Sequence, residues 1–409
     1  MKQISRRHFI QIAGAGAASL TLPSLLSACS AEKKNNSLLL PSYLQGYEAQ
    51  YAQDPKEAAL TWFKDAGFGL FLHYGLYSNL GGEYKGRKIV NKHKPDHAIA
   101  EWIQWHGKID VAEYALLKEQ FTAAHFDADY ITDLALAAGM KYINITTRHH
   151  DSFCLFDSKY TDFNSVNSPA RRDLVAELSE QCQQKGLGLF LYYSHGRDWK
   201  HPHAPSNRDW GVTARPRYEN QQAEYLAEGE ENLAIYAEFM QNQVTELLTN
   251  YGPIAGIWLD GEGVPKQFAK KYDKKHGGGG LAKAIELLKV NELYEKIRAT
   301  QPNTLISYKK GLTGTEDFVA PERKGFGLDG GGKPMEICST LQAHSWGFNK
   351  FTPHRLNAEQ VLETYNQAQK MGANLLLNSG PMGDGRIVKE EAETLKHVGE
   401  LLRQQRRAT

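Results

Sequence analysis

Cysteine is scarce in this sequence, and neither sign of charge dominates it. The 409 residues include only 4 Cys, and 48 Lys and Arg nearly balance 47 Asp and Glu, which leaves a net charge of +1. A near-neutral chain lacks the basic surface that nucleic-acid binding requires, so no nucleic-acid partner is predicted. Hydrophobic residues make up 41% and charged residues 23%, a composition that argues for a folded globular protein and against disorder or several membrane spans.

The first 28 residues are typical of an export signal. Three basic residues precede an apolar stretch at residues 10–26, which polar residues interrupt, so the stretch does not reach the roughly 20 apolar residues of a membrane span. Ser5-Arg-Arg-His-Phe9 resembles a twin-arginine signal, and Leu26-Ser-Ala-Cys29 resembles a bacterial lipobox. We predict that Cys29 carries a lipid, which would be the only membrane attachment, and that the protein lies in the periplasm or at the outer membrane. An ordinary signal peptide with an incidental Cys29 is the alternative.

The remaining chain divides into a short tether and one large domain. Residues 29–45 begin rich in Ser, Lys and Asn and are predicted to be the tether, followed by one large domain at 46–409. Cys154, Cys182 and Cys338 are too widely spaced for a disulfide framework, so buried free thiols are expected.

Apolar runs of strand length alternate with helical patterns along this domain. This alternation predicts a parallel sheet covered by helices and hence an irregular (β/α) barrel of the TIM type, as a single domain without a C-terminal β-sandwich. An open doubly wound sheet is the alternative, but no Gly-x-Gly-x-x-Gly follows the first run. The predicted strands are 68–74, 141–147, 187–194, 254–260, 304–308, 335–341 and 374–379, and the predicted helices are 128–138, 173–185, 230–251, 281–301, 358–371 and 389–407.

Polar and aromatic residues collect where the predicted strands end. Functional side chains of such barrels lie at the carboxyl ends of the strands. Carboxylates beside His, Tyr and Trp suit sugar chemistry, because aromatic rings cover the apolar face of a sugar while one carboxylate attacks the anomeric carbon and another acid protonates the leaving oxygen. The strand ends read His73-Tyr-Gly, Arg148-His149-His150-Asp151, Tyr192-Tyr-Ser194 and Trp258-Leu-Asp260, and the later strands lead to Glu322, Glu336 and Trp346.

Seven segments in order resemble the α-L-fucosidases of glycoside hydrolase family 29. The resemblance covers residues ~60–385 and implies a retaining exo-α-L-fucosidase on an irregular barrel, which releases terminal L-fucose from a fucosylated oligosaccharide by double displacement. The segments are Phe68-Gly-Leu-Phe-Leu-His-Tyr-Gly75, Arg148-His-His-Asp-Ser-Phe153, Arg172-Asp-Leu-Val175, Leu191-Tyr-Tyr-Ser194 with Asp198-Trp199, Ile257-Trp-Leu-Asp-Gly261, Ser345-Trp-Gly-Phe-Asn349 and Asn374-Leu-Leu-Leu-Asn-Ser-Gly-Pro381.

The resemblance also implies roles for individual residues. Asp260 matches the family's nucleophile. The loop that ends in Asp-Phe-Val-Ala-Pro-Glu322 resembles the one that carries the acid/base in several members, and Glu336 is the second candidate for that role. The predicted sugar-binding residues are His73, His149, His150, Tyr192, Trp258 and Trp346.

Departures from the family pattern leave the sugar open. Arg148-His-His-Asp-Ser152 replaces the more usual Lys-His-His-Asp-Gly, Tyr84 stands where many relatives have Trp, and Phe348 replaces a common Tyr. An α-L-galactosidase that acts on L-galactose-containing algal galactans is therefore an alternative, since L-galactose differs from L-fucose by one hydroxyl. A catalytically inactive glycan-binding lipoprotein is the alternative of another class.

A metal site is not predicted. His149 and His150 are the residues that could suggest one, but neighbouring strand residues point to opposite faces, which would make it awkward for both to bind one ion. No metal or other cofactor is therefore expected.

Overall fold

The computed structural model describes residues 39–408 apart from 92–93, 228 and 323–329. One compact unit begins at Leu40, and Tyr43 and Leu44 of the short helix η1 (Ser42–Leu44) are buried in it. Residues 40–45 therefore belong to the folded unit and not, as predicted, to the tether. The predicted signal segment, Cys29 and most of the tether lie outside the described residues.

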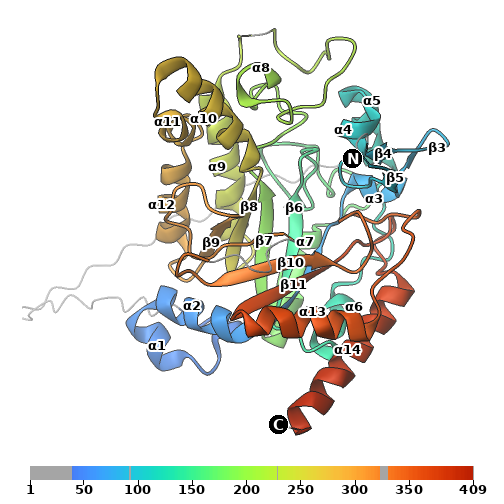
Figure 1. The fold of residues 1–409 in the computed structure, drawn as a ribbon, viewed down its shortest axis with the longest axis vertical. Coiled ribbons are helices and arrows are strands. Elements are labelled where there is room, and N and C mark those ends of the chain that lie inside the picture. Colours follow the sequence, from blue (N-terminus) through green and yellow to red (C-terminus); the bar gives the residue numbers. More distant parts are fainter. Residues whose placement is uncertain (1–38, 92–93, 228, 323–329, 409) are drawn as a thin grey trace, which may run out of the picture. The chain divides into compact units, whose positions relative to one another are not determined.

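A curled parallel sheet forms the centre of the fold (Figure 1). Its seven strands run in the order β10-β11-β1-β6-β7-β8-β9, and every neighbouring pair is parallel. All seven strands predicted from the apolar runs are present. Their bounds are β1 Phe68–Leu72, β6 Tyr142–Arg148, β7 Gly188–Ser194, β8 Gly256–Asp260, β9 Leu305–Tyr308, β10 Met335–Thr340 and β11 Ala373–Ser379.

An irregular segment, residues 317–322, joins the two outer strands of this sheet. Isolated parallel bridges connect it to β9 through Phe318 and to β10 through Val319 and Glu322. Regular pairing fails because Pro321 has no N–H to donate; its carbonyl accepts the N–H of Cys338 at 3.0 Å. The segment acts as an eighth, irregular strand and closes the barrel, which places Glu322 among the carboxyl ends of the strands.

Helices surround the sheet and cover its amino-terminal end. The predicted helix 281–301 is two helices, because Lys289 between them adopts a φ of 49°. Helices α2 and α10 were not predicted, although Asp54 caps α2 and Pro55 opens it. The helices are α1 Glu48–Gln53, α2 Pro55–Ala66, α3 Leu76–Leu80, α4 Ile103–Gly107, α5 Val111–Ala115, η2 Leu116–Gln120, α6 Ala128–Ala137, α7 Leu174–Lys185, α8 Asn207–Trp210, α9 Leu233–Thr249, α10 Gly263–His276, α11 Gly280–Leu287, α12 Val290–Thr300, α13 Ala358–Lys370 and α14 Lys389–Ala408.

Two small hairpins stand beside the barrel mouth near α3. They pair β2 (Glu83–Tyr84) with β3 (Arg87–Lys88) and β4 (Val90–Asn91) with β5 (Lys94–Ala98). No described strand follows β11, so the described part of the chain contains no C-terminal β-sandwich.

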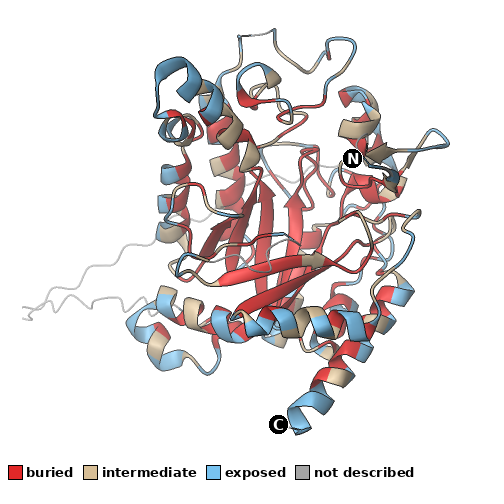
Figure 2. Ribbon diagram, in the orientation of Figure 1, coloured by how far each residue is buried: buried red, intermediate tan, exposed pale blue. Residues whose placement is uncertain are grey.

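Large aromatic side chains fill the barrel because glycines on neighbouring strands leave room for them. A Cβ on Gly69 would lie 2.4 Å from the Tyr142 ring, and one on Gly256 would lie 2.3 Å from Phe190. A Cβ on Gly188 would lie 2.3 Å from Trp62 of α2, which packs into the barrel from below. The strands are buried on both faces (Figure 2). This dense interior gives the strand ends above it a rigid base.

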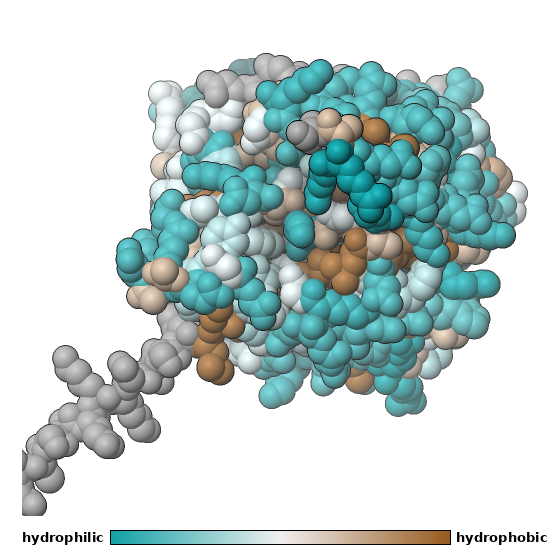
Figure 3. Space-filling model, turned by 90° about the horizontal axis from the view of Figure 1, so that it is seen from below, coloured by the Kyte–Doolittle hydropathy of each residue, from teal (hydrophilic) through white to brown (hydrophobic). Residues whose placement is uncertain are grey.

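The three cysteines of the domain are free and buried, as the sequence predicts. Among the described residues, no helix is long and apolar enough to cross a membrane. The face seen from below is mostly hydrophilic, with several separate small apolar areas (Figure 3).

Candidate active site

A cavity of about 300 Å³ opens at the carboxyl ends of the strands. It brings together side chains that lie as far apart in the sequence as His73 and Trp346. Both carboxylates of the favoured pair, Asp260 and Glu322, line it. So do the six predicted sugar-binding residues, and the further lining residues are Phe71, Glu101, Trp102, Arg197, Glu262, Gly263, Lys309 and Cys338.

Asp260 ends β8 and points into the cavity. Its Oδ2 accepts a hydrogen bond from the Tyr192 hydroxyl at 2.7 Å, and its Oδ1 accepts one from the N–H of Gly261 at 2.6 Å. Burial alone would raise the pKa of Asp260, but the nearby cation of Lys309 and the other polar partners outweigh burial and lower that pKa. The carboxylate is therefore ionised and held in place, as an attacking group must be.

Lys309 is the main site residue that the sequence analysis missed. It directly follows β9, its Nζ lies 3.5 Å from Asp260 Oδ1, and it also forms an ion pair with Glu322 Oε1. The charges of Asp260, Glu322 and nearby Glu262 raise the pKa of Lys309 despite its burial. The signal was available, because Lys309 follows the run 304–308 just as Asp260 follows its own strand.

The structure distinguishes the two acid/base candidates. Glu322 lines the cavity and is partly exposed, its side chain being 48% accessible. Glu336 is fully buried below the cavity, where it accepts hydrogen bonds from Tyr142 Oη at 2.7 Å and Trp258 Nε1 at 3.0 Å. Burial raises the pKa of Glu336 to about 7. Glu336 has the protonation of an acid catalyst but does not line the cavity, whereas Glu322 does.

Glu262 is a third carboxyl group at this site and was also missed. It lies two positions after Asp260 and lines the cavity. Burial and the charge of Asp260 raise the pKa of Glu262. Its position after the end of β8 gave no strand pattern by which to find it.

His73 presents a hydrogen-bond acceptor to the cavity. Asn378 donates through its amide N–H groups to Thr340 Oγ1 and the carbonyl of Trp346, so its Oδ1 is an acceptor. The Nδ1 of His73, at 2.7 Å from that oxygen, must therefore carry the proton. Burial lowers the pKa of His73, so the ring is neutral and its Nε2 is free to accept from a hydroxyl.

The same reasoning identifies which ring nitrogen of His150 carries the proton. Ser194 donates its hydroxyl to the carbonyl of Arg197 at 2.8 Å, so it accepts from His150 Nδ1 at 2.6 Å. His150 Nε2 is then an acceptor, 3.7 Å from Asp260 Oδ2. Burial lowers the pKa of His150, so it too is neutral. A sugar hydroxyl near both atoms could donate to either.

His149 lines the cavity together with His150, contrary to the expectation that the two point to opposite faces. The alternation of strand side chains ends with β6 at Arg148, and the chain turns at the next residues. Among the described residues His149 Nδ1 has no hydrogen-bond partner, and burial lowers the pKa of His149 to about 3. Such a buried unpaired nitrogen favours a polar ligand.

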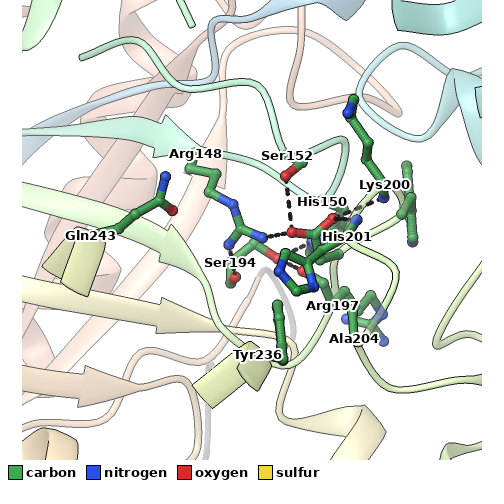
Figure 4. Close-up of polar contacts among 12 residues, drawn as sticks. Arg148, His150, Ser152, Ser194, Arg197, Lys200, His201, Ala204, Tyr236 and Gln243 are labelled. Atoms are coloured by element: carbon green, nitrogen blue, oxygen red, sulfur yellow. Dashed lines mark hydrogen bonds and ion pairs between the residues drawn. The ribbon is translucent and has the colours of Figure 1, made fainter. Parts of the chain in front are cut away.

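A buried ion pair is linked to His150 through Ser194 (Figure 4). Arg148 pairs with Asp198 and donates to the carbonyl of Ser194 at 2.7 Å. Ser152 donates to Asp198 at 2.9 Å. Arg148 and Ser152, two of the residues that depart from the family pattern, therefore bind the same carboxylate, and Arg148 also fixes the Ser194 segment to which His150 is bonded.

Aromatic side chains form the walls. Trp258 stacks on Tyr192 with ring centroids 5.5 Å apart, and Trp346 stacks on His73 at 5.2 Å. Glu101, another missed residue, fixes the Trp346 loop by accepting from the N–H groups of Trp346 at 3.0 Å and Gly347 at 3.1 Å. Flat apolar faces among neutral acceptors suit a polyhydroxylated ring.

Among the described residues, one set of three side chains is close enough together to hold a metal ion. Ligand atoms of His149, His150 and Asp260 all lie within 4.8 Å of one another. The fit is poor, because His150 Nδ1 and both Asp260 oxygens already have partners and the Lys309 ammonium lies beside that carboxylate. A second cation there would be repelled.

Comparisons with known proteins agree with this geometry. The α-L-fucosidase family profile matches residues 40–406. The chain is 25% identical to a putative α-L-fucosidase of Caenorhabditis elegans, over 83% of this chain and 64% of that protein, so it spans less than two thirds of that relative's length. It is also 25% identical to human plasma α-L-fucosidase, over 84% of this chain and 67% of the human one.

Solved structures are similar over most of the domain. Lactobacillus casei α-L-fucosidase AlfC, solved with α-L-fucose, superposes with a TM-score of 0.71 at 31% identity, over 85% of this chain and 99% of AlfC. The α-L-fucosidase isoenzyme 1 of Paenibacillus thiaminolyticus gives 0.67 at 31%, over 85% of this chain and 76% of its own. The barrel and its carboxylate-lined cavity are those of a glycoside hydrolase. The chain belongs to the α-L-fucosidase family.

Proposed function

We propose that this protein is a retaining exo-α-L-fucosidase. The observation that carries the proposal is that Asp260 and Glu322 line one cavity and pair with the same Lys309 ammonium. Two carboxyl groups that share one cation are close together. Retaining enzymes need a separation of about 5–5.5 Å, and inverting enzymes one of about 6.5–9.5 Å to admit a water.

The proposed reaction has two displacements. Asp260 attacks the anomeric carbon while Glu322 protonates the departing glycosidic oxygen, which leaves an ester between the sugar and Asp260. Glu322 then takes a proton from a water that attacks the same carbon and releases the sugar with its original configuration. The ionised state of Asp260 and the exposure of Glu322 toward the cavity suit these roles.

The cavity and the relatives both support a fucosylated oligosaccharide as the proposed substrate. The cavity is small, about 300 Å³, and His73, Trp258 and Trp346 are among the residues that line it, which favours a single terminal sugar, as an exo-enzyme requires. AlfC has been solved with Fuc(α1,6)GlcNAc and with 4-nitrophenyl-α-L-fucopyranoside, so we propose fucosylated oligosaccharides as substrates here.

The test is hydrolysis by the purified protein of 4-nitrophenyl α-L-fucoside, with the matching α-L-galactoside in parallel. We expect fucoside turnover, and nuclear magnetic resonance should detect α-L-fucose before the β-anomer. Asp260→Gly should lose roughly 10³-fold or more in turnover and regain activity with azide as β-fucosyl azide. A first product of β configuration would reject retention, and preference for the galactoside would reject the sugar.

We also propose that Cys29 carries a lipid and holds the enzyme at the periplasmic side of a membrane or at the outer membrane. The support is the sequence around Cys29, which resembles a lipobox behind an export signal. Metabolic labelling with an alkyne fatty acid should mark the wild-type protein and not Cys29→Ser. Equal labelling of both would reject the anchor.

A further inference from the structure

The least expected group in the cavity is the cation between the two proposed catalytic acids. Lys309 takes a φ of 51°, a left-handed conformation that is uncommon for residues with a side chain. Its carbonyl accepts the N–H of Ala320 at 2.8 Å, which ties β9 to the closing segment that carries Glu322. Its Nζ lies 5.2 Å from the centre of the Trp258 ring. The backbone conformation directs a charged side chain, only 13% accessible, to the point where β8 and residues 317–322 meet.

We propose that Lys309 is a positioning residue that makes Glu322 alternate between acid and base, by transferring its electrostatic support from Asp260 to Glu322 within each catalytic cycle. The inference rests on the proposed function and deepens it, because it names the group that times the two steps. Lys309 itself gives up no proton.

The charges of the two steps show how this would work. In the free enzyme Asp260 is ionised, and the Lys309 ammonium is shared between the two carboxyl groups. In the first step Asp260 forms its bond to the anomeric carbon, the glycosidic bond breaks, and the proton of Glu322 goes to the leaving oxygen. Asp260 is then a neutral ester, and the Lys309 charge acts on Glu322 alone.

The second step reverses this. Glu322, paired with Lys309, takes a proton from the attacking water, whose oxygen bonds to the anomeric carbon as the ester bond to Asp260 breaks. Asp260 recovers its negative charge and its pairing with Lys309. Without Lys309, the Glu322 carboxylate would lose its cation partner after the first step, since no other described residue pairs with both carboxylates.

The other groups around Lys309 do not take over this role. The histidines are neutral because burial lowers their pKa values, and burial raises the pKa of the Cys338 thiol, so it is neutral too. Glu262 adds a negative charge near Lys309. Among the described residues, Arg197 is the other cation that lines the cavity, and its Nε donates to the carbonyl of Thr213 at 3.0 Å. The histidines are His73, His149 and His150.

The experiment compares Lys309→Met with Lys309→Arg and with the control Lys310→Met, a change at the exposed neighbouring lysine. The pH profile of kcat/KM is measured with a fucosyl disaccharide, whose leaving group needs the acid. A charge within about 4–6 Å shifts a carboxyl pKa by about 1–3 units. For Lys309→Met, the acidic and the basic limb of the pH profile should therefore both move upward by about one pH unit or more. Lys309→Arg and Lys310→Met should keep the wild-type limbs.

The second readout is the nitrophenyl fucoside, whose leaving group needs no acid. With this substrate kcat reports the base-assisted second step. Lys309→Met should lower kcat at least tenfold more than it lowers kcat/KM. Azide should restore kcat. A merely structural role would lower activity without moving the limbs, and that result would overturn the inference. If Lys309→Met does not fold by circular dichroism, Lys309→Gln carries the same measurements.

The failure of this inference can be told apart from the failure of the proposed function. An active wild-type enzyme whose Lys309→Met profile is unmoved rejects the role of Lys309 alone. A wild-type protein that cleaves neither fucoside nor galactoside rejects the proposed function and this inference with it.

Discussion

Trp258 and Glu336 are joined by a hydrogen bond of 3.0 Å from the indole N–H to Oε1. The ring of Trp258 lines the cavity, whereas Glu336 lies below it. An acid with the pKa of a proton donor thus supports the Trp258 wall from beneath and does not line the cavity. Glu336 is better explained as a structural support beneath the cavity than as the catalytic acid/base.

Glu336→Gln should therefore change stability more than activity. Burial raises the pKa of Glu336 from 4.5 to about 7, so in this range the folded state holds a proton that the unfolded chain has lost. Folding then becomes less favourable as the pH rises from about 4.5 to 7, by about 3 kcal/mol at 1.36 kcal/mol per unit, and changes no further above that.

The check on Glu336 is the unfolding midpoint between pH 4.5 and 8. Glu336→Gln should flatten its decline with pH and keep turnover within about tenfold of wild type. Loss of turnover by a factor of 10³, with azide rescue, would instead make Glu336 the acid/base.

Glu322→Ala should show a loss that depends on the leaving group. Without its acid, the variant should cleave an unactivated fucoside about 10²–10⁴-fold more slowly, while the first step on the nitrophenyl substrate persists. Azide should accelerate the nitrophenyl reaction and give α-fucosyl azide, of configuration opposite to that from Asp260→Gly.

Glu262→Gln is the matched control for Glu322, since both carboxyl groups line the cavity near Asp260. It should cost less than about tenfold on either substrate and show no azide rescue. If Glu262→Gln gives the leaving-group dependence and Glu322→Ala does not, the acid/base role belongs to Glu262.

Arg148→Met should destabilise the fold strongly. It leaves Asp198 fully buried without its partner, and breaking a buried ion pair costs about 3–5 kcal/mol. The double variant Arg148→Met with Asp198→Asn removes both charges and should recover much of that loss. Urea unfolding of the three proteins checks this, and additive losses would contradict the coupling of the pair.

Chelation should leave activity unchanged. The Lys309 ammonium lies 3.5 Å from the carboxylate that a metal would need, so EDTA dialysis should not reduce fucoside turnover, nor should added Zn²⁺ raise it. Loss of turnover on dialysis that Zn²⁺ restores would place an ion on His149, His150 and Asp260.

Much of the fold could be predicted from local sequence. Each strand is buried on both faces and reads as a short apolar run, and Asp260, His73 and Tyr192 could be placed because they lie within or directly after such runs. The closing segment 317–322 could not be predicted, since its pairing is irregular and depends on the distance between β9 and β10. Helix α2 was not predicted, although Asp54 and Pro55 mark its start, because it precedes the first strand and so lies outside the alternation of strands and helices.

The sequence by itself determined the barrel and the carboxylate, aromatic and histidine content of the site, because these follow from periodicity and from what ends each strand, and the family resemblance added the nucleophile candidate. Tertiary structure alone decided that Lys309 joins Asp260 to Glu322, that Glu336 lies beneath the cavity, and that His149 and His150 share one cavity. Those relations depend on lateral packing between strands and on burial, and neither is encoded at any single position of the chain.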